Sequence, residues 1–495
     1  MRYISTRNAD ISVSGHRAVV EGIAPGGGLF APVELPKIEN LVHIDDMPYT
    51  MRLAHVINLW LDEFSPDELQ AVCDDSYDRF DDPAIAPVKA LNGGRYALEL
   101  WHGPTLAFKD MALQLLPGLM RMCADKAGEK RDILILVATS GDTGKAALEG
   151  FADQPGVRIC VFYPENGVSH AQKLQMITQT GANVDVIAVR GNFDDAQTGV
   201  KKIFTDERMI DVLNNHSIRL SSANSINLGR LLPQVAYYAA AYGEMVKSGY
   251  IPYGAAINVC VPTGNFGNIL AAYYAMGMGV PINRLVCASN CNNVLSDFIN
   301  TGVYDANREF HLTSSPSMDI LISSNLERLL FEISGRDHGQ VRRWMDELSR
   351  TGRYALNAAQ KSALKERFFG GWASEEEVAR EIRRVYEEDN YLVDPHTAVA
   401  MKVARDYREK TFDNTPMLIA STASPFKFAG SVLRAIMPDI ECGDDFACCR
   451  ALSEVTGTEV PPAIAELAYK PILHNGVCDP ADMERALLEN LDIRL

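Results

Sequence analysis

The chain has 495 residues, a formal net charge of −17 and a hydrophobic content of 47%. This length is too great for one compact core, so we expect two or three domains. The acidic balance argues against nucleic acids and anionic membranes as partners. No apolar run is long enough for a membrane-spanning helix, and the first ten residues lack the apolar core of a signal peptide.

The ten cysteines are scattered and none forms a CxxC pair. This pattern argues against a zinc site, so we expect no metal. Reduced, buried thiols in a cytoplasmic enzyme are the simplest interpretation.

The first ninety residues contain a Gly/Pro turn at 24–28 and a predicted helix around Met51–Glu63. From Arg131 onward, short apolar runs alternate with glycine-containing turns and helical periodicity. The predicted strands are Ile133–Ala138, Val157–Tyr163, Val184–Val189, Ile257–Val261, Leu285–Ala288 and Met417–Ala420. Continuous rather than alternating apolar runs are typical of strands buried on both faces. We therefore predict an α/β fold with parallel sheets flanked by helices.

The segment Glu332–Asn390 is rich in Arg, Glu and Lys and lacks strand-like runs. It is interpreted as a helical insertion with solvated faces. The predicted division is an N-terminal domain over 1–95, an α/β core of two subdomains over 96–330, the insertion over 331–390, and a C-terminal part over 391–495 that completes the large domain.

Two glycine-containing loops follow predicted strands and precede helices. The first, TSGDTG at 139–144, presents backbone N–H groups to an anion, either a nucleotide phosphate or a carboxylate. The NTPase phosphate motif is excluded because Lys145 is followed by Ala146. The second loop, PTGNFGN at 262–268, adds asparagine donors. For the first loop alone, a plain strand–helix turn is an equal alternative.

Lys109 lies in HGPTLAFKD at 102–110, at the start of a helix that Pro117 is expected to kink. Its apolar neighbours could desolvate the amine and lower its pKa, which would favour a Schiff base. Judged alone, such a lysine is far more often a surface residue with a buried stem.

Two further segments carry polar groups suited to a ligand. NSINLGR at 224–230 gathers two amides, a hydroxyl and a guanidinium, a donor set suited to a phosphate dianion. A helix-capping turn is the more common interpretation of that segment alone. STASPFKF at 421–428 follows a strand and offers a hydroxyl to a heterocyclic nitrogen, although it also reads as an ordinary turn.

Taken together and in this order, the five segments resemble the threonine synthase family, in its longer bacterial and fungal form. The similarity includes YISTRN, EGIAPGGGLFAP, SPSMDILISSNLERLLFE and DPHTAVA, and it spans essentially the whole chain. The resemblance implies a pyridoxal-phosphate (PLP) enzyme of fold type II, similar to the tryptophan synthase β subunit, with the cofactor bound by the α/β core.

The resemblance also implies roles for individual residues. Lys109 resembles the lysine that binds PLP covalently and later moves protons, and Thr422 resembles the partner of the pyridine nitrogen. The implied cradle for the cofactor phosphate is Gly264, Asn265, Phe266, Gly267 and Asn268. The implied loop around the substrate carboxylate and the phenolate edge of PLP is Ser140, Gly141, Asp142 and Thr143. The implied substrate-phosphate group is Asn224, Ser225, Asn227 and Arg230.

Asp142 is a special case. Many relatives carry Asn there, although the longer form commonly carries Asp, and an ionised carboxylate would repel the phenolate. Its role is therefore left open at this point.

The implied reaction converts O-phosphohomoserine and water to threonine and phosphate, the last step of threonine biosynthesis, in a monomer or homodimer. A phospho-lyase acting on a related phosphorylated amino acid is a close alternative. A non-catalytic PLP-fold protein that only binds a ligand is another, although the intact Lys109 argues against it. A dehydratase or sulfhydrylase is disfavoured because neither needs NSINLGR.

Overall fold

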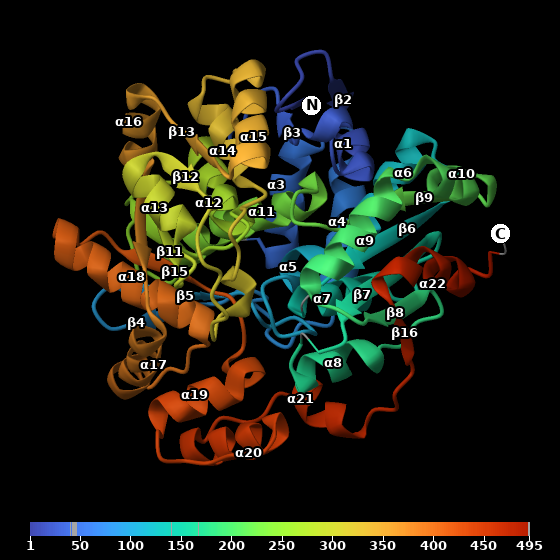
Figure 1. Ribbon diagram of the computed structural model, residues 1–495. Helices are drawn as coiled ribbons and strands as arrows, with labels where there is room; N and C mark the ends of the chain where they lie inside the picture. The colour runs from blue at the N-terminus through green and yellow to red at the C-terminus, as the bar shows by residue number, and fades with distance from the viewer. Residues whose placement is uncertain (40, 42–46, 140, 167, 494–495) are drawn as a thin grey trace.

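The computed structural model describes residues 1–39, 41, 47–139, 141–166 and 168–493. Two parallel sheets form its centre, and Figure 1 shows them on opposite halves of the molecule, each flanked by helices. A smaller antiparallel sheet near the N-terminus has the order β2-β1-β3. Its strands are β1 (Arg2–Ser5), β2 (Ser12–Ser14) and β3 (Phe30–Pro32).

The larger sheet is six-stranded, with the order β14-β11-β10-β15-β5-β4. Its strands are β4 (Val88–Leu91), β5 (Arg95–Glu99), β10 (Ile257–Pro262), β11 (Ile282–Ser289), β14 (Phe368–Trp372) and β15 (Met417–Ser421). All neighbours pair in parallel except β4 with β5. The predicted strands in this part of the chain are therefore confirmed as β10, β11 and β15.

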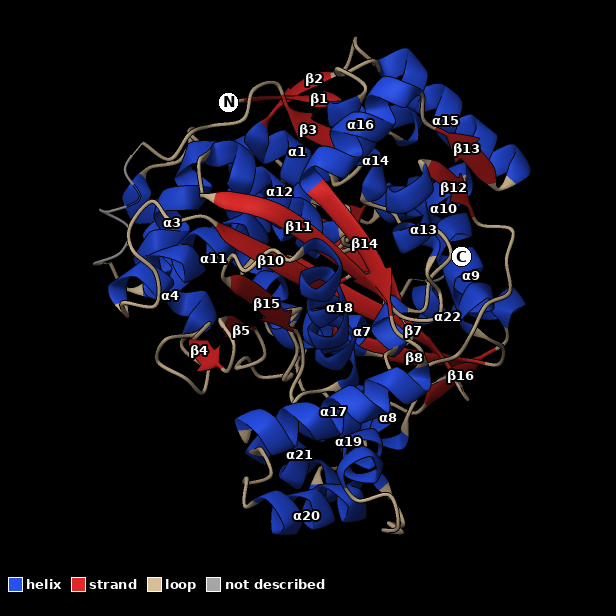
Figure 2. Ribbon diagram, turned by 90° about the vertical axis from the view of Figure 1, so that its left-hand side faces the viewer, coloured by secondary structure: helices blue, strands red, loops and turns tan. Residues whose placement is uncertain are grey.

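Successive residues of β10 point into different cores, as the strand period requires. Val259 and Val261 belong to the core that includes α12 (Gly267–Met278), whereas Cys260 belongs to the core that includes α18 (Pro395–Thr411). Figure 2 shows α18 lying across this sheet. Burial on both faces explains why the sequence runs are continuously apolar.

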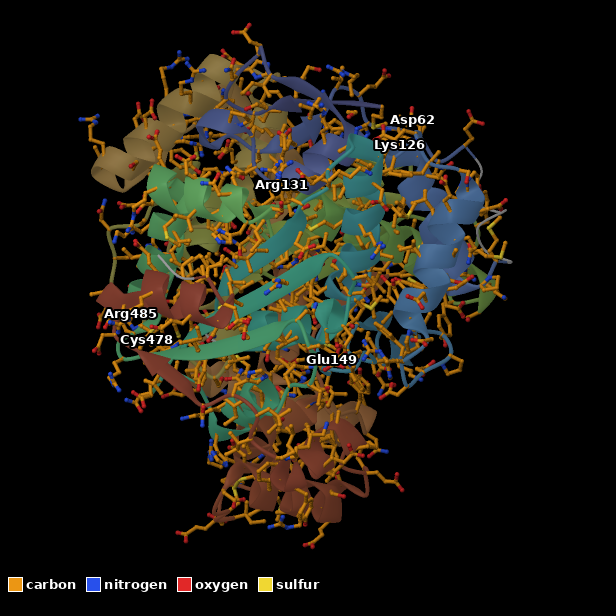
Figure 3. All side chains as sticks on the ribbon, turned by 90° about the vertical axis from the view of Figure 1, so that its right-hand side faces the viewer. Asp62, Lys126, Arg131, Glu149, Cys478 and Arg485 are labelled. Carbon is orange, nitrogen blue, oxygen red and sulfur yellow. A yellow bond between two sulfur atoms is a disulfide. The ribbon has the colours of Figure 1, made fainter. Side chains whose placement is uncertain are left out.

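The second sheet is five-stranded and wholly parallel, with the order β16-β8-β7-β6-β9. Its strands are β6 (Asp132–Ala138), β7 (Val157–Pro164), β8 (Val184–Val189), β9 (Ile218–Ser221) and β16 (Gly476–Cys478). Figure 3 shows this sheet with Cys478 on the edge strand beside α22 (Met483–Asn490). The region 391–495 is thus divided, because β15 joins the six-stranded sheet and β16 joins this one.

Helices complete both halves. Those of the N-terminal region and the Lys109 segment are α1 (Gly15–Glu21), α3 (Tyr49–Trp60), α4 (Pro66–Tyr77), α5 (Asp110–Leu113) and α6 (Leu116–Ala127). The five-stranded half adds α7 (Asp142–Phe151), α8 (His170–Ile177), α9 (Phe193–Thr205) and α10 (Glu207–Asn215). The six-stranded half adds α11 (Leu228–Lys247), α13 (Val294–Thr301), α14 (Leu326–Ile333), α15 (His338–Thr351), α16 (Ala358–Arg367) and α17 (Glu375–Asp389). The C-terminal region adds α19 (Ala429–Ile436), α20 (Asp445–Thr456) and α21 (Pro462–Ala465).

Two predictions about helices are confirmed. The helix expected around residues 51–63 is α3, and the helix after Lys109 is interrupted before Pro117, which lies in the first turn of α6. A proline is tolerated there because the first turn of a helix has no intrahelical partner for its N–H. Among the described helices, none is both long and apolar enough to cross a membrane.

The prediction that the segment 332–390 lacks strands was wrong. It contains β13 (Arg353–Ala355), paired with β12 (Val303–Asp305), and β14, which pairs in parallel with β11. Two glycines let β14 pack closely: a Cβ on Gly370 would lie 2.7 Å from the carbonyl oxygen of Ser296, and one on Gly371 would lie 2.6 Å from Val403. A short run of aromatic residues and glycines lacks the β-branched pattern that predicts a strand.

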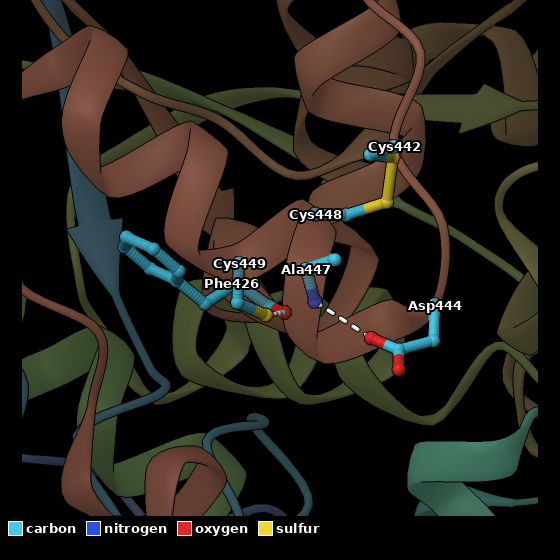
Figure 4. The surroundings of a disulfide bond; sticks show 6 residues. All are labelled: Phe426, Cys442, Asp444, Ala447, Cys448 and Cys449. Atoms are coloured by element: carbon cyan, nitrogen blue, oxygen red, sulfur yellow. Dashed lines mark hydrogen bonds between the residues drawn. A yellow bond between two sulfur atoms is a disulfide. The ribbon is translucent and has the colours of Figure 1, made fainter.

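The expectation of reduced thiols was also wrong at one place, since Cys442 and Cys448 form a disulfide (Figure 4). Asp444 caps α20 by accepting a hydrogen bond from the N–H of Ala447 at 2.7 Å. This turn returns Cys448 to within 5.2 Å of Cys442, Cα to Cα, a separation typical of disulfides. The spacing of these cysteines matches no standard motif, so the disulfide could not be predicted from the sequence.

Candidate active site

Lys109 lies between the two parallel sheets, directly before α5. The preceding residue, Phe108, donates its backbone N–H to the carbonyl of Thr422 at 2.8 Å, and Ala107 forms an isolated bridge with Ala423. Because Thr422 follows β15, the end of that strand is fixed beside the lysine. The structure therefore brings together the two residues predicted to bind the reactive aldehyde and the ring nitrogen.

The Lys109 amine is buried among polar groups. Its Nζ donates to Ser317 Oγ at 3.0 Å and lies 3.7 Å from Asp142 Oδ2. Burial lowers the pKa of Lys109 to about 8, although Asp142 acts in the opposite direction. A lysine with this pKa is neutral in about one molecule in ten at pH 7, far more often than an ordinary lysine, and a nucleophile or general base requires the neutral amine.

Asp142, the first residue of α7, faces two cations. Its Oδ1 lies 2.9 Å from Lys427 Nζ and accepts a hydrogen bond from Gln172 at 3.3 Å. Burial opposes ionisation, but Lys427 and then Lys109 outweigh it and hold the pKa of Asp142 well below its usual range. The carboxylate is therefore ionised and directed at lysines, which answers the question that the sequence left open about its charge.

The remainder of the 139–144 loop is shaped by Thr139, whose Oγ1 accepts hydrogen bonds from the N–H groups of Gly141 at 3.1 Å and Gly144 at 3.0 Å. Gly141 has a φ of 148°, and a Cβ there would lie 2.6 Å from the Gln172 amide. Thr143 is partly buried in the first turn of α7. Ser140 lies outside the described residues.

The 262–268 loop suits an anionic group. Phe266 has a φ of 64°, and Gly267 opens α12, so backbone N–H groups of its first turn face the loop. Asn268 is buried, and its Nδ2 has no hydrogen-bond partner in the part of the chain that the structure describes. Asn265 is exposed, and Gly264 packs tightly, since a Cβ would lie 2.7 Å from the carbonyl oxygen of Ser317. An unsatisfied amide at a helix N-terminus fits a phosphate group.

Arg230 is a buried cation, only 4% exposed. One guanidinium nitrogen donates to the carbonyl of Ala223 at 3.0 Å, whereas Nε has no partner within the described residues. Burial lowers its pKa to about 10, and its charge in turn lowers the pKa of Lys109. A buried guanidinium without a carboxylate among the described side chains suits a phosphate dianion.

The other residues of the 224–230 segment differ in position. Ser225 is partly buried, and its hydroxyl accepts from Asn325 at 3.2 Å. Asn227 is fully buried and its side chain bonds Val19 at 3.0 Å, Ser222 at 3.1 Å and Gly229 at 2.8 Å. Asn227 therefore caps α11 and fixes the loop, whereas Asn224 is exposed.

Sequence reasoning assigned no role to Lys427, Gln172 and Ser317, which contact Asp142 or Lys109. It also assigned none to His396, which accepts a hydrogen bond from the Ser317 N–H, or to Asp394, which bonds His396. Lys427 stood inside a quoted motif, and Ser317, Asp394 and His396 stood inside two others. The sequence features around Lys427 and Asp394 did not indicate a site, because a lysine after a strand and a helix that starts with Asp-Pro are both common on protein surfaces.

Two sheets of mainly parallel strands, with glycine loops around the buried Lys109 amine, define a PLP-dependent α/β enzyme of fold type II. Comparison with family models agrees. Residues 85–422 match the model "pyridoxal-phosphate dependent enzyme", residues 2–77 match "threonine synthase N terminus", and residues 397–472 match "threonine synthase, C-terminal".

Similarity to individual proteins identifies the family within this class of PLP-dependent enzymes. Threonine synthase of Pseudomonas aeruginosa is 37% identical over 438 residues, which cover 88% of this chain and 90% of that one. The crystal structure of PLP-bound threonine synthase from Brucella melitensis has a TM-score of 0.88 at 35% identity and covers 99% of this chain and 98% of that one. The chain belongs to the threonine synthase family. The predicted fold type and the family's cofactor, PLP, are thereby confirmed.

Human threonine synthase-like 1 is also similar, with 41% identity over 448 residues and 85% of this chain covered. The chain spans 57% of the length of that protein. Membership of the family therefore leaves the reaction itself to be argued from the site.

Proposed function

We propose that the chain is a threonine synthase, which converts O-phospho-L-homoserine and water to L-threonine and phosphate. The observation that carries this proposal is the buried guanidinium of Arg230, whose positive charge lowers the pKa of Lys109. The α-carboxylate of an amino-acid substrate is assigned to the 139–144 loop, so a further buried cation suits a substrate that carries a second anionic group. A γ-phosphate fits that requirement in charge and in its demand for donors.

The residues of the site fit PLP. Lys109 would bind it covalently, residues 264–268 with the unsatisfied Asn268 amide would hold its phosphate, and Thr422 would bond its ring nitrogen. When bound, the cofactor supplies an electron sink for carbanion chemistry next to the substrate amine.

The chain's own groups account for the rest of the reaction. Lys109, with its lowered pKa, would remove the α-proton and return protons during the later steps. Arg230 and Ser225 would bind the phosphate and stabilise its negative charge as it leaves the γ-carbon. A β-proton must also leave before the phosphate can. One proton then adds at the γ-carbon, the hydroxyl of water adds at the β-carbon and a proton returns to the α-carbon, which gives threonine.

A phospho-lyase is the second candidate, because the similarity to threonine synthase-like 1 leaves a reaction other than threonine synthesis open. Such an enzyme would release phosphate without adding water at the β-carbon. The same binding residues would serve both reactions, so the products distinguish them.

The test is product analysis with purified protein, PLP and O-phosphohomoserine, with Lys109→Ala as the control. Equal amounts of phosphate and threonine are expected from the unaltered protein and neither product from the variant. Phosphate accompanied by a 2-oxo acid instead of threonine would identify a phospho-lyase. A protein that binds PLP and releases no phosphate would contradict both reactions and leave ligand binding alone.

A further inference from the structure

The turn that contains Ser317 contacts the Lys109 amine, and His396 on α18 contacts that turn. The proposed reaction assigns neither residue a role. Ser317 lies in the short turn η2 (Pro316–Met318), and its Oγ accepts the hydrogen bond from Lys109 Nζ at 3.0 Å. The backbone N–H of Ser317 donates to His396 Nε2, on α18, at 3.2 Å. The imidazole thus holds the turn, and the turn's hydroxyl holds the amine.

The bonds of His396 define its tautomer. Its Nδ1 lies 2.6 Å from Asp394 Oδ2, and Asp394 is fully buried as the N-cap of α18. Since Nε2 accepts an N–H, the ring carries its proton on Nδ1 and donates it to the carboxylate. Asp394 is itself fixed by the N–H groups of His396 at 2.9 Å and Thr397 at 3.2 Å.

This arrangement restricts the direction of the Lys109 lone pair. A neutral amine has two N–H bonds and one lone pair, and it rotates freely unless a partner holds one N–H. A fixed acceptor on one side leaves the lone pair to point elsewhere, toward a substrate proton. The turn has little freedom to move, because Gly264 packs against the Ser317 carbonyl at a distance that no Cβ could occupy.

We propose that Ser317 is a further catalytic residue, which orients the Lys109 amine, and that Asp394 and His396 are positioning residues that fix the Ser317 turn. Ser317 keeps its own proton, and no covalent bond to it forms or breaks. The proposal rests on the proposed function in one respect, the use of Lys109 as the base.

Four variants test it: Ser317→Ala, Ser314→Ala, His396→Gln and His396→Leu. Ser314 is the matched control because it lies in the same loop and bonds Glu375 through its backbone N–H, at 2.9 Å. Glutamine can place an amide oxygen near the position of Nε2, whereas leucine offers no acceptor. The first measurement is the rate at which the full-length apoprotein binds PLP covalently, followed by absorbance. The second is kcat and KM with O-phosphohomoserine.

We expect Ser317→Ala and His396→Leu to lower the attachment rate and kcat by on the order of tenfold, with equilibrium PLP content and KM unchanged. Ser314→Ala should match the unaltered protein, and His396→Gln should recover most of both rates. If Ser317→Ala behaved as Ser314→Ala in both measurements, the proposal would be overturned. If the attachment rate and kcat of His396→Gln were as low as those of His396→Leu, the positioning role of His396 would be wrong.

The two measurements separate this inference from the proposed function. Attachment of PLP requires no substrate, so a slow Ser317→Ala supports the orienting role even in a protein that does not make threonine. An unaltered protein that makes threonine, together with an unaffected Ser317→Ala, would reject the orienting role and leave the proposed function intact.

Discussion

Lys427 and Asp142 form an ion pair between the two halves of the molecule, with Nζ and Oδ1 separated by 2.9 Å. Lys427 lies in the short helix η3 (Pro425–Phe428), which follows β15 of the six-stranded sheet, and Asp142 opens α7 beside the five-stranded sheet. The side chains are only 3% and 4% exposed. The pair therefore joins the two halves beside the buried amine of Lys109.

Replacing Lys427 by Met is expected to destabilise the protein by about 3 kcal/mol, because among the described residues it leaves the buried carboxylate with Lys109 as its one cationic partner. Adding Asp142→Asn should recover at least half of that loss, since the carboxylate that lost Lys427 is then replaced by a neutral amide. Urea unfolding of the two single variants and the double variant measures the effect. A double variant less stable than Lys427→Met would contradict the coupling.

The pH dependence of Lys109 should follow its lowered pKa. Since only the neutral amine reacts, covalent attachment of PLP to the apoprotein should accelerate with pH and level off above about 8, the pKa of Lys109. Asp142 raises this pKa and Lys427 lowers it. Asp142→Asn should therefore shift the profile to lower pH, and Lys427→Met should shift it to higher pH. Shifts in the same direction for both variants would show that the charges do not act as described.

Arg230→Met should raise KM for O-phosphohomoserine by on the order of 100-fold, the loss expected for charge-assisted hydrogen bonds to a dianion. PLP content should not change, because the proposal places the cofactor phosphate at the 262–268 loop and not at Arg230. Stability should not fall, because removing a buried guanidinium without a carboxylate partner among the described residues also removes its desolvation cost. An equal loss of PLP and substrate binding, measured by absorbance and kinetics, would assign Arg230 a structural role.

The disulfide should stabilise the C-terminal region without affecting catalysis. It closes a short loop, so Cys442→Ser combined with Cys448→Ser should cost about 2 kcal/mol. Thermal unfolding with and without dithiothreitol tests this, because the reductant should lower Tm of the unaltered protein and leave that of the double variant unchanged. An unaltered protein insensitive to the reductant would argue against the bond.

Six strands of the two large sheets (β6, β7, β8, β10, β11 and β15) and the glycine loops could be predicted from the sequence because each depends on local pattern. Buried parallel strands require continuous apolar runs, and a glycine such as Gly141, with its positive φ, marks a turn that other residues rarely adopt. β14 was not predicted because glycine is required at positions 370 and 371 by close contacts with Ser296 and Val403, which are distant in sequence. Local pattern carries no information about such contacts.

Local sequence pattern was equally insufficient to predict the contacts of the candidate active site. A donor-rich segment suggested phosphate binding, yet only the structure separates Arg230, which has a free guanidinium nitrogen within the described part, from Asn227, whose side chain is fully engaged. The partners of Asp142 come from α8 and from the C-terminal quarter of the chain. Long-range partners of this kind determine charge and orientation, and no spacing rule predicts them.

The most direct measurement is borohydride reduction of the PLP-loaded protein, followed by peptide mapping of the modified lysine. We expect one stoichiometric pyridoxyl group on Lys109. Modification of Lys427, the other lysine that contacts Asp142, or of no lysine at all, would contradict the account.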